Sequence, residues 1–575
     1  MVQGRLSHAT SRVARQGVIV DINRPALSHV KGVIEPPLTE MTIGEALSNA
    51  VIRWPDRAAL VVPHQDIRWT YRDLNLHVDA LAAGLLELGL KRGDRVGIWS
   101  PNRAEWVVTQ LATARVGLIL VTINPAYRSA EVALALSLST CRALVFASQF
   151  KGSDYLEMID KLFPDDASRG GRELDLLIQL DGPTLPGAIT YQDLLDTGRA
   201  ITTKSRKDIA EEICSSDAIN IQFTSGTTGT PKGATLTHRN ILNNAIFVAH
   251  RIRLTEQDRL CLPVPLYHCF GMVMGTLACL CTGAALVLSG ESFDAQAVLQ
   301  TIEIERCTAL YGVPTMFVAV LEHPTFPVYD LTSLRTGIMA GAPCPIEVMN
   351  RVIADMRMRE VTICYGMTET SPVSFQSTAD ADIETRTSTV GFVHPHIEAK
   401  VIDQTGLTVP RGHSGELLVR GYSVMAGYWG ASPQTAEVID PDGWMHTGDL
   451  AIIDAEGRAR IVGRSKDMII RGGENIYPAE IENYLSRHPA ISEVAVFGVP
   501  DERLGEEVCA WIKTRRFIDE DAIRKFCDGH IAHFKMPRHI RFVDFFPMTV
   551  TGKIQKFEMR ARMRDELGRS EQSTA

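Results

Sequence analysis

The sequence lacks any regular arrangement of cysteines. Eleven cysteines are scattered over 575 residues without a C-x-x-C pair, and the tightest spacing joins Cys279 and Cys281 in an apolar run. Zinc sites and disulfide frameworks depend on close, repeated cysteine spacings, so both are disfavoured. We expect buried thiols in a reducing compartment, which is the cytoplasm or, alternatively, the mitochondrial matrix.

The sequence also has no excess of positive charge. It contains 59 Lys and Arg against 68 Asp and Glu, a formal net charge of −9. A general affinity for nucleic acid or for an anionic membrane is therefore not expected, although local basic patches remain compatible with this balance. With 45% hydrophobic and 22% charged residues, the composition is that of a soluble globular protein.

An unbroken membrane-spanning run is absent as well. No Asp, Glu, Lys or Arg occurs between Leu260 and Gly290, a length that could cross a bilayer. Prolines and glycines, beginning with Pro263 and Pro265, divide this stretch into short pieces. It predicts a buried strand, a loop and a core helix, and no transmembrane segment.

What the sequence does contain is a regular alternation of amphipathic helices and short apolar strands. Segment 70–90 has leucines at helical spacing behind a capping box of Thr70 and Asp73. A helix is also expected at 104–117. Strand-like runs are found at 95–100, 117–123, 143–148, 174–180, 284–288 and 308–313. This alternation predicts an α/β fold with parallel-rich layers.

The length exceeds what one hydrophobic core supports, so several domains are expected. The first 20 residues contain arginines and no acidic side chain, as a transit peptide or a disordered extension would. Short strands and Gly-rich turns after about residue 385 predict a β-rich subdomain. The expected units are a flexible extension (1–35), a large N-terminal domain (36–463, with the β-rich subdomain at about 385–463), a linker (464–467), a small α+β domain (468–566) and a tail (567–575).

One stretch has the composition of a phosphate-binding loop. Residues 224–233, TSGTTGTPKG, combine glycines, hydroxyls and Lys232, but they do not complete the G-x-x-x-x-G-K-[ST] spacing of a Walker loop. The stretch follows a strand-like run and precedes a helix beginning near Thr237, a context in which anions are bound. A flexible surface turn has a similar composition.

Three further stretches are weak on their own. In 364–370, CYGMTET, Glu369 could hold Mg²⁺ and Tyr365 could stack on a base, although a helix cap explains the stretch equally well. In 444–450, WMHTGDL, Asp449 together with Arg464 could bind ribose hydroxyls, or form an ordinary turn. In 551–556, TGKIQK, Lys553 is either a functional or a solubilising lysine.

In this order and at these intervals, the four stretches resemble the adenylate-forming superfamily of acyl-CoA synthetases, luciferases and peptide-synthetase adenylation domains. The resemblance covers about residues 40–565. RSKDMIIRGGENIYPAEIE (464–482) and the TGKIQK ending are most similar to medium-chain fatty acid enzymes of the acyl-CoA synthetase family member 2 type. The resemblance implies a large adenylation domain and a mobile C-terminal domain that rotates about the 464–467 hinge.

The resemblance also implies the site residues. ATP contacts correspond to Thr224, Ser225, Gly226, Thr227, Thr228, Gly229, Lys232, Gly341, Ala342, Pro343, Tyr365, Gly366, Thr368, Asp449, Arg464 and Lys553. Catalytic roles correspond to Lys553, Thr224, Glu369 (also the Mg²⁺ ligand) and His268. The hinge and the CoA contacts correspond to Lys466, Asp467, Gly472, Gly473 and Glu474, and the acyl pocket to His268, Phe270, Met274, Met316 and Cys364. Lys466 stands where many relatives have aspartate and others lysine, so this departure is tolerated in the family.

The implied reaction joins a carboxylic acid to CoA through an acyl-adenylate, with ATP, Mg²⁺ and CoA as cofactors. The stretch 265–280 contains no Asp or Glu that could pair with an amino-acid substrate, which favours an uncharged, medium-chain acyl group. The alternatives are an aryl or substituted short-chain acid, an enzyme that loads a carrier protein's phosphopantetheine, or a non-catalytic nucleotide-binding scaffold. Homodimers are common in such families, which leaves a homodimer open.

Overall fold

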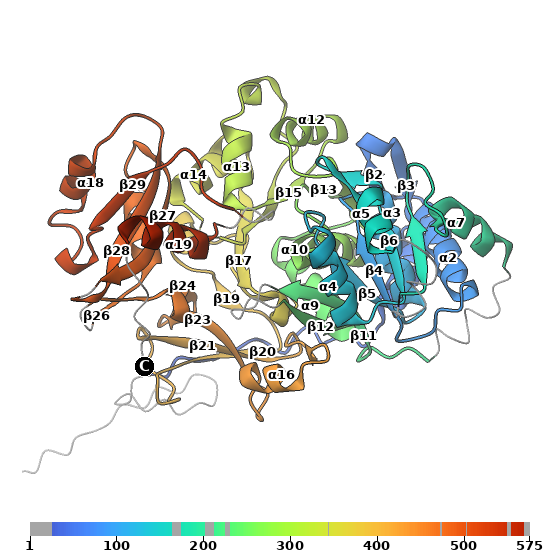
Figure 1. The fold of residues 1–575 in the computed structure, drawn as a ribbon, viewed down its shortest axis with the longest axis horizontal. Coiled ribbons are helices and arrows are strands. Elements are labelled where there is room, and N and C mark those ends of the chain that lie inside the picture. The colour runs from blue at the N-terminus through green and yellow to red at the C-terminus, as the bar shows by residue number, and fades with distance from the viewer. Residues whose placement is uncertain are drawn as a thin grey trace, which may run out of the picture.

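The computed structural model describes residues 26–163, 174–201, 212–224, 231–342, 344–471, 474–501, 503–548 and 554–568. In Figure 1 the two large sheets lie to the right and centre, the β-rich subdomain below them and the C-terminal domain to the left.

The first large sheet has eight strands in the order β10-β9-β6-β4-β5-β11-β12-β22. Its strands are β4 (Arg95–Trp99), β5 (Ile119–Ile123), β6 (Ala143–Phe146), β9 (Leu176–Gln179), β10 (Ile189–Thr190), β11 (Ala218–Thr224), β12 (Lys232–Thr237) and β22 (Gly427–Tyr428). Strands β10 to β11 pair in parallel, whereas β12 and β22 pair antiparallel.

The second large sheet has nine strands in the order β19-β18-β17-β16-β15-β13-β14-β2-β3. Its strands are β2 (Ala58–Val62), β3 (Ile67–Thr70), β13 (Arg259–Cys261), β14 (Ala285–Val287), β15 (Ala309–Gly312), β16 (Thr336–Ala340), β17 (Glu360–Gly366), β18 (Val373–Gln376) and β19 (Phe392–Val393). Strands β17 to β2 run parallel. The α/β layers predicted from the sequence are therefore confirmed.

Helices cover these sheets and also separate them. They are α1 (Ile43–Arg53), α2 (Tyr71–Glu87), α3 (Ala104–Arg115), α4 (Ser129–Ser139), α5 (Tyr155–Leu162), α7 (Tyr191–Ala200), α9 (His238–Arg251), α12 (Ala295–Glu305), α13 (Pro314–Leu321), α14 (Ile346–Ala354), α15 (Ile383–Ser388) and α16 (Ser432–Val438). The largest core joins side chains of both sheets with those of α2, α3 and α9, so these helices pack between the sheets. The predicted Thr70/Asp73 capping box opens α2.

The apolar stretch 260–290 folds as predicted into a strand, a loop and core helices. After β13 come α10 (Cys269–Gly271), a π-helical segment (Met272–Leu277) and α11 (Ala278–Thr282), which lead into β14. Among the described residues, no helix has both the length and the apolar character needed to cross a bilayer.

The β-rich subdomain contains an antiparallel sheet in the order β1-β20-β21-β23-β24. Its strands are β1 (His29–Lys31), β20 (Ile397–Ile402), β21 (Ser414–Gly421), β23 (Met445–Ile453) and β24 (Ala459–Arg464). One expectation needs correction, because β1 comes from the segment predicted to be a flexible extension. His29 pairs with Lys400, so the chain is anchored in this sheet before residue 35.

The C-terminal domain has its own sheet, in the order β26-β25-β28-β27, with β29 added beside β28. Its elements are β25 (Ile469–Arg471), β26 (Glu474–Ile476), α17 (Pro478–Leu485), β27 (Ile491–Asp501), β28 (Gly505–Thr514), α18 (Glu520–Cys527), β29 (His539–Phe542) and α19 (Lys556–Leu567). Two hydrophobic clusters of its own fill it. A short 3₁₀ turn (Ser465–Asp467) connects it to β24.

Candidate active site

Two of the expected nucleotide contacts, Gly341 and Tyr365, lie at the carboxyl-terminal ends of neighbouring strands in the nine-stranded sheet. β16 and β17 run parallel and pair Ala340 with Cys364, so Gly341 and Tyr365 follow directly beyond this last pair. Ligands of open α/β sheets bind beyond the carboxyl ends of the parallel strands. Gly341 also needs its conformational freedom, since its φ is +90°.

Gly366 is explained by packing. A Cβ atom at this position would lie 1.7 Å from the carbonyl oxygen of Pro372, so no side chain fits. The residue ends β17 and precedes a 3₁₀ turn (Thr368–Thr370) that is buried throughout. Its missing side chain therefore allows the turn that carries Glu369 to approach the following strand.

The phosphate-loop candidate connects two strands. Thr224 ends β11 and pairs with Lys232 at the start of antiparallel β12, so the loop closes a hairpin. The helix expected near Thr237 is α9, which begins at His238 with Thr237 as its N-cap, but β12 lies between it and the loop. The dipole of α9 is thus not available at the loop, and backbone amides and hydroxyls are left as the anion donors.

Glu369 has a buried carboxylate that accepts hydrogen bonds from two hydroxyl groups. It is 5% exposed. Its Oε1 atom accepts hydrogen bonds of 3.1 Å from both Thr224 Oγ1 and the Tyr428 hydroxyl. The Glu369 carbonyl accepts the backbone N–H of Met425 at 2.9 Å, which fixes the main chain. None of the ion pairs among the described residues includes Glu369, so this carboxylate fits a cation as its partner.

A second cluster surrounds Asp449. The Tyr365 hydroxyl donates to Asp449 Oδ2 at 2.6 Å, and Arg464 Nε donates to Oδ1 at 3.0 Å. Asp449 is 5% exposed, so its charge is compensated by these two donors. Burial, together with Asp449, raises the pKa of the Tyr365 hydroxyl, which keeps it a protonated donor. Tyr365 is thereby fixed beside the ribose-binding candidates.

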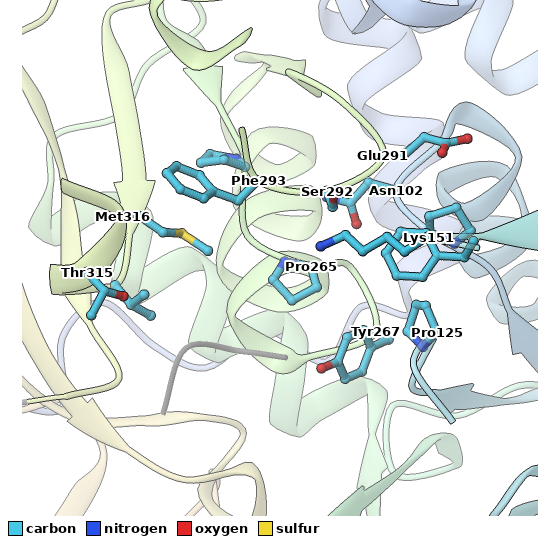
Figure 2. Close-up of a pocket in the computed structure, with 14 residues that line it drawn as sticks. Asn102, Pro125, Lys151, Pro265, Tyr267, Glu291, Ser292, Phe293, Thr315 and Met316 are labelled. Atoms are coloured by element: carbon cyan, nitrogen blue, oxygen red, sulfur yellow. The ribbon is translucent and has the colours of Figure 1, made fainter. Parts of the chain in front are cut away.

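A cavity of about 250 Å³ opens between the carboxyl ends of strands from both sheets (Figure 2). Its walls come from the loops after β4, β5, β13 and β14, from the start of α13 after β15, and from the hairpin of β7 (Gln149–Phe150) and β8 (Ser153–Asp154). Tyr267, Phe293 and Met316 supply apolar and aromatic surface. Lys151 extends along the cavity with its ammonium toward Pro265, whereas the Glu291 carboxylate lies at the end far from Met316.

The expected acyl-pocket residues divide into two groups. Met316 lines this cavity, whereas Phe270, Met274 and Cys364 are buried outside its lining. Phe270 packs on Tyr311 at a ring-centroid distance of 5.7 Å, which is core packing. His268 adjoins Tyr267, and its Nδ1 accepts the N–H of Phe270 at the start of α10.

The absence of an acidic residue does not extend to the whole cavity. Residues 265–280 contain no Asp or Glu, but Glu291 reaches the cavity from the loop after β14. Burial raises the pKa of its carboxyl group. Figure 2 shows this carboxylate directed away from Met316 and Tyr267. The apolar part of the cavity therefore has no acidic group from Glu291 to pair with a cationic substrate.

The expected hinge residues Lys466 and Asp467 lie in the 3₁₀ turn between β24 and β25. Partial burial and the neighbouring Arg464 lower the pKa of the Lys466 ammonium. Glu474 begins β26 and pairs with Arg471. Two contacts of the C-terminal domain with the N-terminal domain are a 3.3 Å hydrogen bond between the hydroxyls of Ser414 and Tyr477, and a 3.8 Å ion pair of Arg515 with Glu322.

Several expected site residues lie outside the described residues. They are Ser225, Gly226, Thr227, Thr228, Gly229, Pro343, Gly472, Gly473 and Lys553. Three others are described. Ala342 lies just beyond β16, and Thr368 lies in the buried turn before Glu369. Lys232 pairs with Thr224.

Sequence reasoning missed Tyr428, Lys151 and Glu291. Tyr428 is 59 residues from Glu369 in the chain, and no local pattern indicates their bond. Lys151 belongs to a two-strand turn without periodicity. Glu291 could have been suspected as the first charged residue after the apolar stretch 260–290.

The chain matches two family models: AMP-binding enzyme over residues 47–429 and AMP-binding enzyme C-terminal domain over residues 480–553. It is 44% identical over 557 residues to the mitochondrial medium-chain acyl-CoA ligase ACSF2 of Mus musculus, spanning 94% of this chain and 90% of that protein. It is also 44% identical over 536 residues to the putative acyl-CoA synthetase YngI of Bacillus subtilis (strain 168), spanning 91% and 97%.

Solved structures agree with this assignment. The anthranilate CoA ligase AuaEII in complex with anthranoyl-AMP superposes with a TM-score of 0.82 at 26% identity, covering 93% of this chain and 99% of its own. ATP-bound MatB from Rhodopseudomonas palustris gives 0.79 at 29% identity, covering 92% and 100%. With the AMP-binding enzyme model matching residues 47–429, this protein belongs to the AMP-binding enzyme family.

Proposed function

We propose that this protein is an ATP-dependent acyl-CoA ligase that acts on a medium-chain carboxylic acid. The observation that carries the proposal is the convergence of Thr224, Glu369, Tyr365 and Asp449, which come from three separate chain segments but form two adjoining polar clusters. The names of the ACSF2 and YngI relatives support the same reaction.

The chemistry requires activation because a carboxylate has no adequate leaving group. In the first step a carboxylate oxygen attacks the α-phosphorus of ATP, the bond to pyrophosphate breaks, and an acyl-adenylate forms. In the second step the CoA sulfur attacks the acyl carbon, the thiol proton is lost, and the bond to AMP breaks. Neither step needs a covalent enzyme nucleophile, so catalysis depends on alignment and charge stabilisation.

The residues of this chain divide that task. The loop at 224–233, which includes Lys232, holds the β- and γ-phosphates, Asp449 with Arg464 holds the ribose, and Tyr365 stacks on the adenine. Glu369 holds Mg²⁺, which in proteins commonly takes one or two carboxylates plus substrate phosphates. When bound, Mg²⁺ supplies positive charge against the phosphate oxygens. The carboxylate of Glu369 fits this role because it is buried and, among the described residues, forms no ion pair.

Lys553 provides the cation at the reacting phosphate. Two unit negative charges at 4 Å repel by about 4 kcal/mol at an effective dielectric of 20, so a carboxylate approaching ATP needs a compensating charge. We place this lysine between the carboxylate and the α-phosphate in the first step. In the second step, rotation about Lys466 and Asp467 removes it and brings the 471–475 loop, with Gly472 and Gly473, toward the pantetheine arm of CoA.

The cavity at Tyr267 and Met316 receives the acyl group in this proposal. Its volume of about 250 Å³ is slightly below the range of drug-sized ligand pockets, which begins at roughly 300 Å³. A medium-length aliphatic chain therefore suits it better than a long one. The aromatic wall formed by Tyr267 and Phe293 keeps an aryl acid as the second candidate, as in the anthranilate CoA ligase AuaEII.

The test is pyrophosphate release from ATP with a panel of C4 to C16 and aryl acids, with and without CoA. We expect the highest rate with C6 to C10 acids, together with thioester formation when CoA is present. A preference for an aryl acid would support the second candidate, and turnover only with a phosphopantetheinylated carrier protein would support the loading enzyme. No pyrophosphate release with any acid would favour a non-catalytic nucleotide-binding scaffold.

We also propose that the protein works in a reducing compartment, the cytoplasm or alternatively the mitochondrial matrix, and that it forms a homodimer. All eleven cysteines are free thiols, which agrees with a reducing compartment. Light scattering after size-exclusion chromatography tests the dimer, and fractionation of the source cells tests the location.

A further inference from the structure

Tyr428 connects two parts of the candidate site that the sequence had treated as separate. It lies in β22, where Ala234 of β12 pairs with it, so it is next to the strand that begins with Lys232. Its backbone N–H donates to Thr435 Oγ1 of α16 at 2.9 Å. The backbone of Tyr428 is thus held on both sides, which fixes the direction of its side chain.

The hydroxyl of Tyr428 and that of Thr224 donate to the same atom, Oε1 of Glu369, each at 3.1 Å. Hydrogen bonds to an ionised acceptor are the stronger kind and fix the rotation of a carboxylate. Among the described residues no hydrogen bond reaches Oε2 of Glu369. The second oxygen is therefore the one presented to a cation.

The ring of Tyr428 has a separate contact. The Lys232 ammonium lies 5.1 Å from its centroid, within the range of a cation–π interaction. One side chain thus touches both a phosphate-binding lysine and the magnesium-binding carboxylate of the proposed function.

We propose that Tyr428 is a positioning residue for nucleotide activation: its hydroxyl orients Glu369 toward the divalent cation, and its ring orients Lys232 toward the phosphates. The inference rests on the proposed function for the roles of Glu369 and Lys232. Residues that orient a metal ligand through hydrogen bonds typically change metal affinity by about 10- to 100-fold when removed. Tyr428 also contributes packing to the core, and a packing role alone predicts a different set of effects.

The deciding variant is Tyr428→Phe, which removes the hydroxyl but retains the ring and its contact with Lys232. The matched control is Tyr422→Phe, because Tyr422 is a nearby buried tyrosine whose hydroxyl is 3.3 Å from Asn244 Nδ2. Three measurements are made on the full chain: the Mg²⁺ dependence of pyrophosphate release, thioester formation from presynthesised acyl-adenylate, and calorimetric binding of a non-hydrolysable ATP analogue with Mg²⁺ or with EDTA.

We expect Tyr428→Phe to raise the half-saturating Mg²⁺ concentration about tenfold, the lower end of that range. Analogue binding should weaken with Mg²⁺ but not in EDTA, and thioester formation from acyl-adenylate should be unchanged, because that step does not involve the pyrophosphate end of ATP. Tyr428→Leu, which also removes the cation–π contact, should in addition weaken analogue binding in EDTA. Tyr422→Phe should change none of these.

An unchanged Mg²⁺ dependence, or equal losses in both half-reactions together with a lowered melting temperature, would overturn the inference in favour of simple packing. Failure of the proposed function is distinguishable. Suppose that the native chain activates no acid, but that Tyr428→Phe still weakens analogue binding in Mg²⁺ and not in EDTA. The positioning role then stands and the ligase assignment fails.

Discussion

The Tyr365 hydroxyl donates a 2.6 Å hydrogen bond to Oδ2 of Asp449, joining the edge of the nine-stranded sheet to the β-rich subdomain. This bond links the residue expected beneath the adenine with the carboxylate expected to bind the ribose. Both oxygens of Asp449 already accept one donor each, from Tyr365 and Arg464. A carboxylate oxygen has a second lone pair, so two ribose hydroxyls can still be accommodated.

We therefore expect Tyr365→Phe to bind ATP about tenfold more weakly, since a hydrogen bond to a charged group contributes about 1.5 kcal/mol. The ring remains, so stacking on the base is retained. Equilibrium binding of ATP and of 2′,3′-dideoxy-ATP measures the effect. The native protein should prefer ATP, and Asp449→Asn should largely abolish that preference. A preference that Asp449→Asn leaves intact would contradict the ribose assignment.

In the proposed function, Lys553 acts in adenylation and not in transfer to CoA. Removing a charge donor that acts on the reacting group typically costs 10²- to 10³-fold in rate. We expect Lys553→Ala to slow pyrophosphate release by about this factor and to leave thioester formation from presynthesised acyl-adenylate within about threefold. The matched control is Lys525→Ala, which removes an exposed lysine of α18. Equal slowing of both half-reactions would exclude a role confined to adenylation.

The turn at Ser465–Asp467 is the only covalent connection between β24 and β25, so rotation of the C-terminal domain must occur there or nearby. Proline fixes φ and restricts the residue before it. Lys466→Pro should therefore spare acyl-adenylate formation but block transfer to CoA, whereas Lys466→Ala should permit both. Assaying each half-reaction separately tests this prediction, and equal loss in both would refute the hinge assignment.

Local patterns in the sequence were sufficient for most of the fold. The Thr70/Asp73 capping box predicted α2, and the apolar run at 117–123 predicted β5, because both signals lie within the element itself. β1 could not be predicted in this way. Its three residues become a strand only by pairing with β20, and His29 and Lys400 are far apart in the chain.

The same distinction holds for the site. Thr224, Glu369 and Asp449 were identifiable because they belong to short motifs whose order the resemblance supplied. Their partner Tyr428 was not, since its role depends on β22 pairing with β12 at the edge of a sheet. The cavity was not predictable either, because its walls are loops that follow strands of two different sheets.

A pH-dependent stability follows from His238 at the start of α9. It is 0% exposed, and its Nδ1 accepts the N–H of Ile43 at 3.1 Å. Burial lowers the pKa of His238 to about 4, against 6.5 for the free side chain. Because the folded-state pKa is depressed, its contribution to stability is fully present above pH 6.5 and is lost as the pH falls toward 4. The difference of about 2.5 units corresponds to about 3 kcal/mol.

His238→Asn should remove this dependence, because its side-chain oxygen can accept from Ile43 without titrating. The measurement is the urea midpoint of the full chain at several pH values between 4 and 7. The native protein should lose stability as the pH falls below 6.5, and the variant should lose less. The slopes of their stability against pH should differ by at most the uptake of one proton on unfolding. His394, another buried histidine with a lowered pKa, contributes to both curves and cancels in the comparison. Parallel curves would mean that His238 does not supply the proton-linked part of the stability.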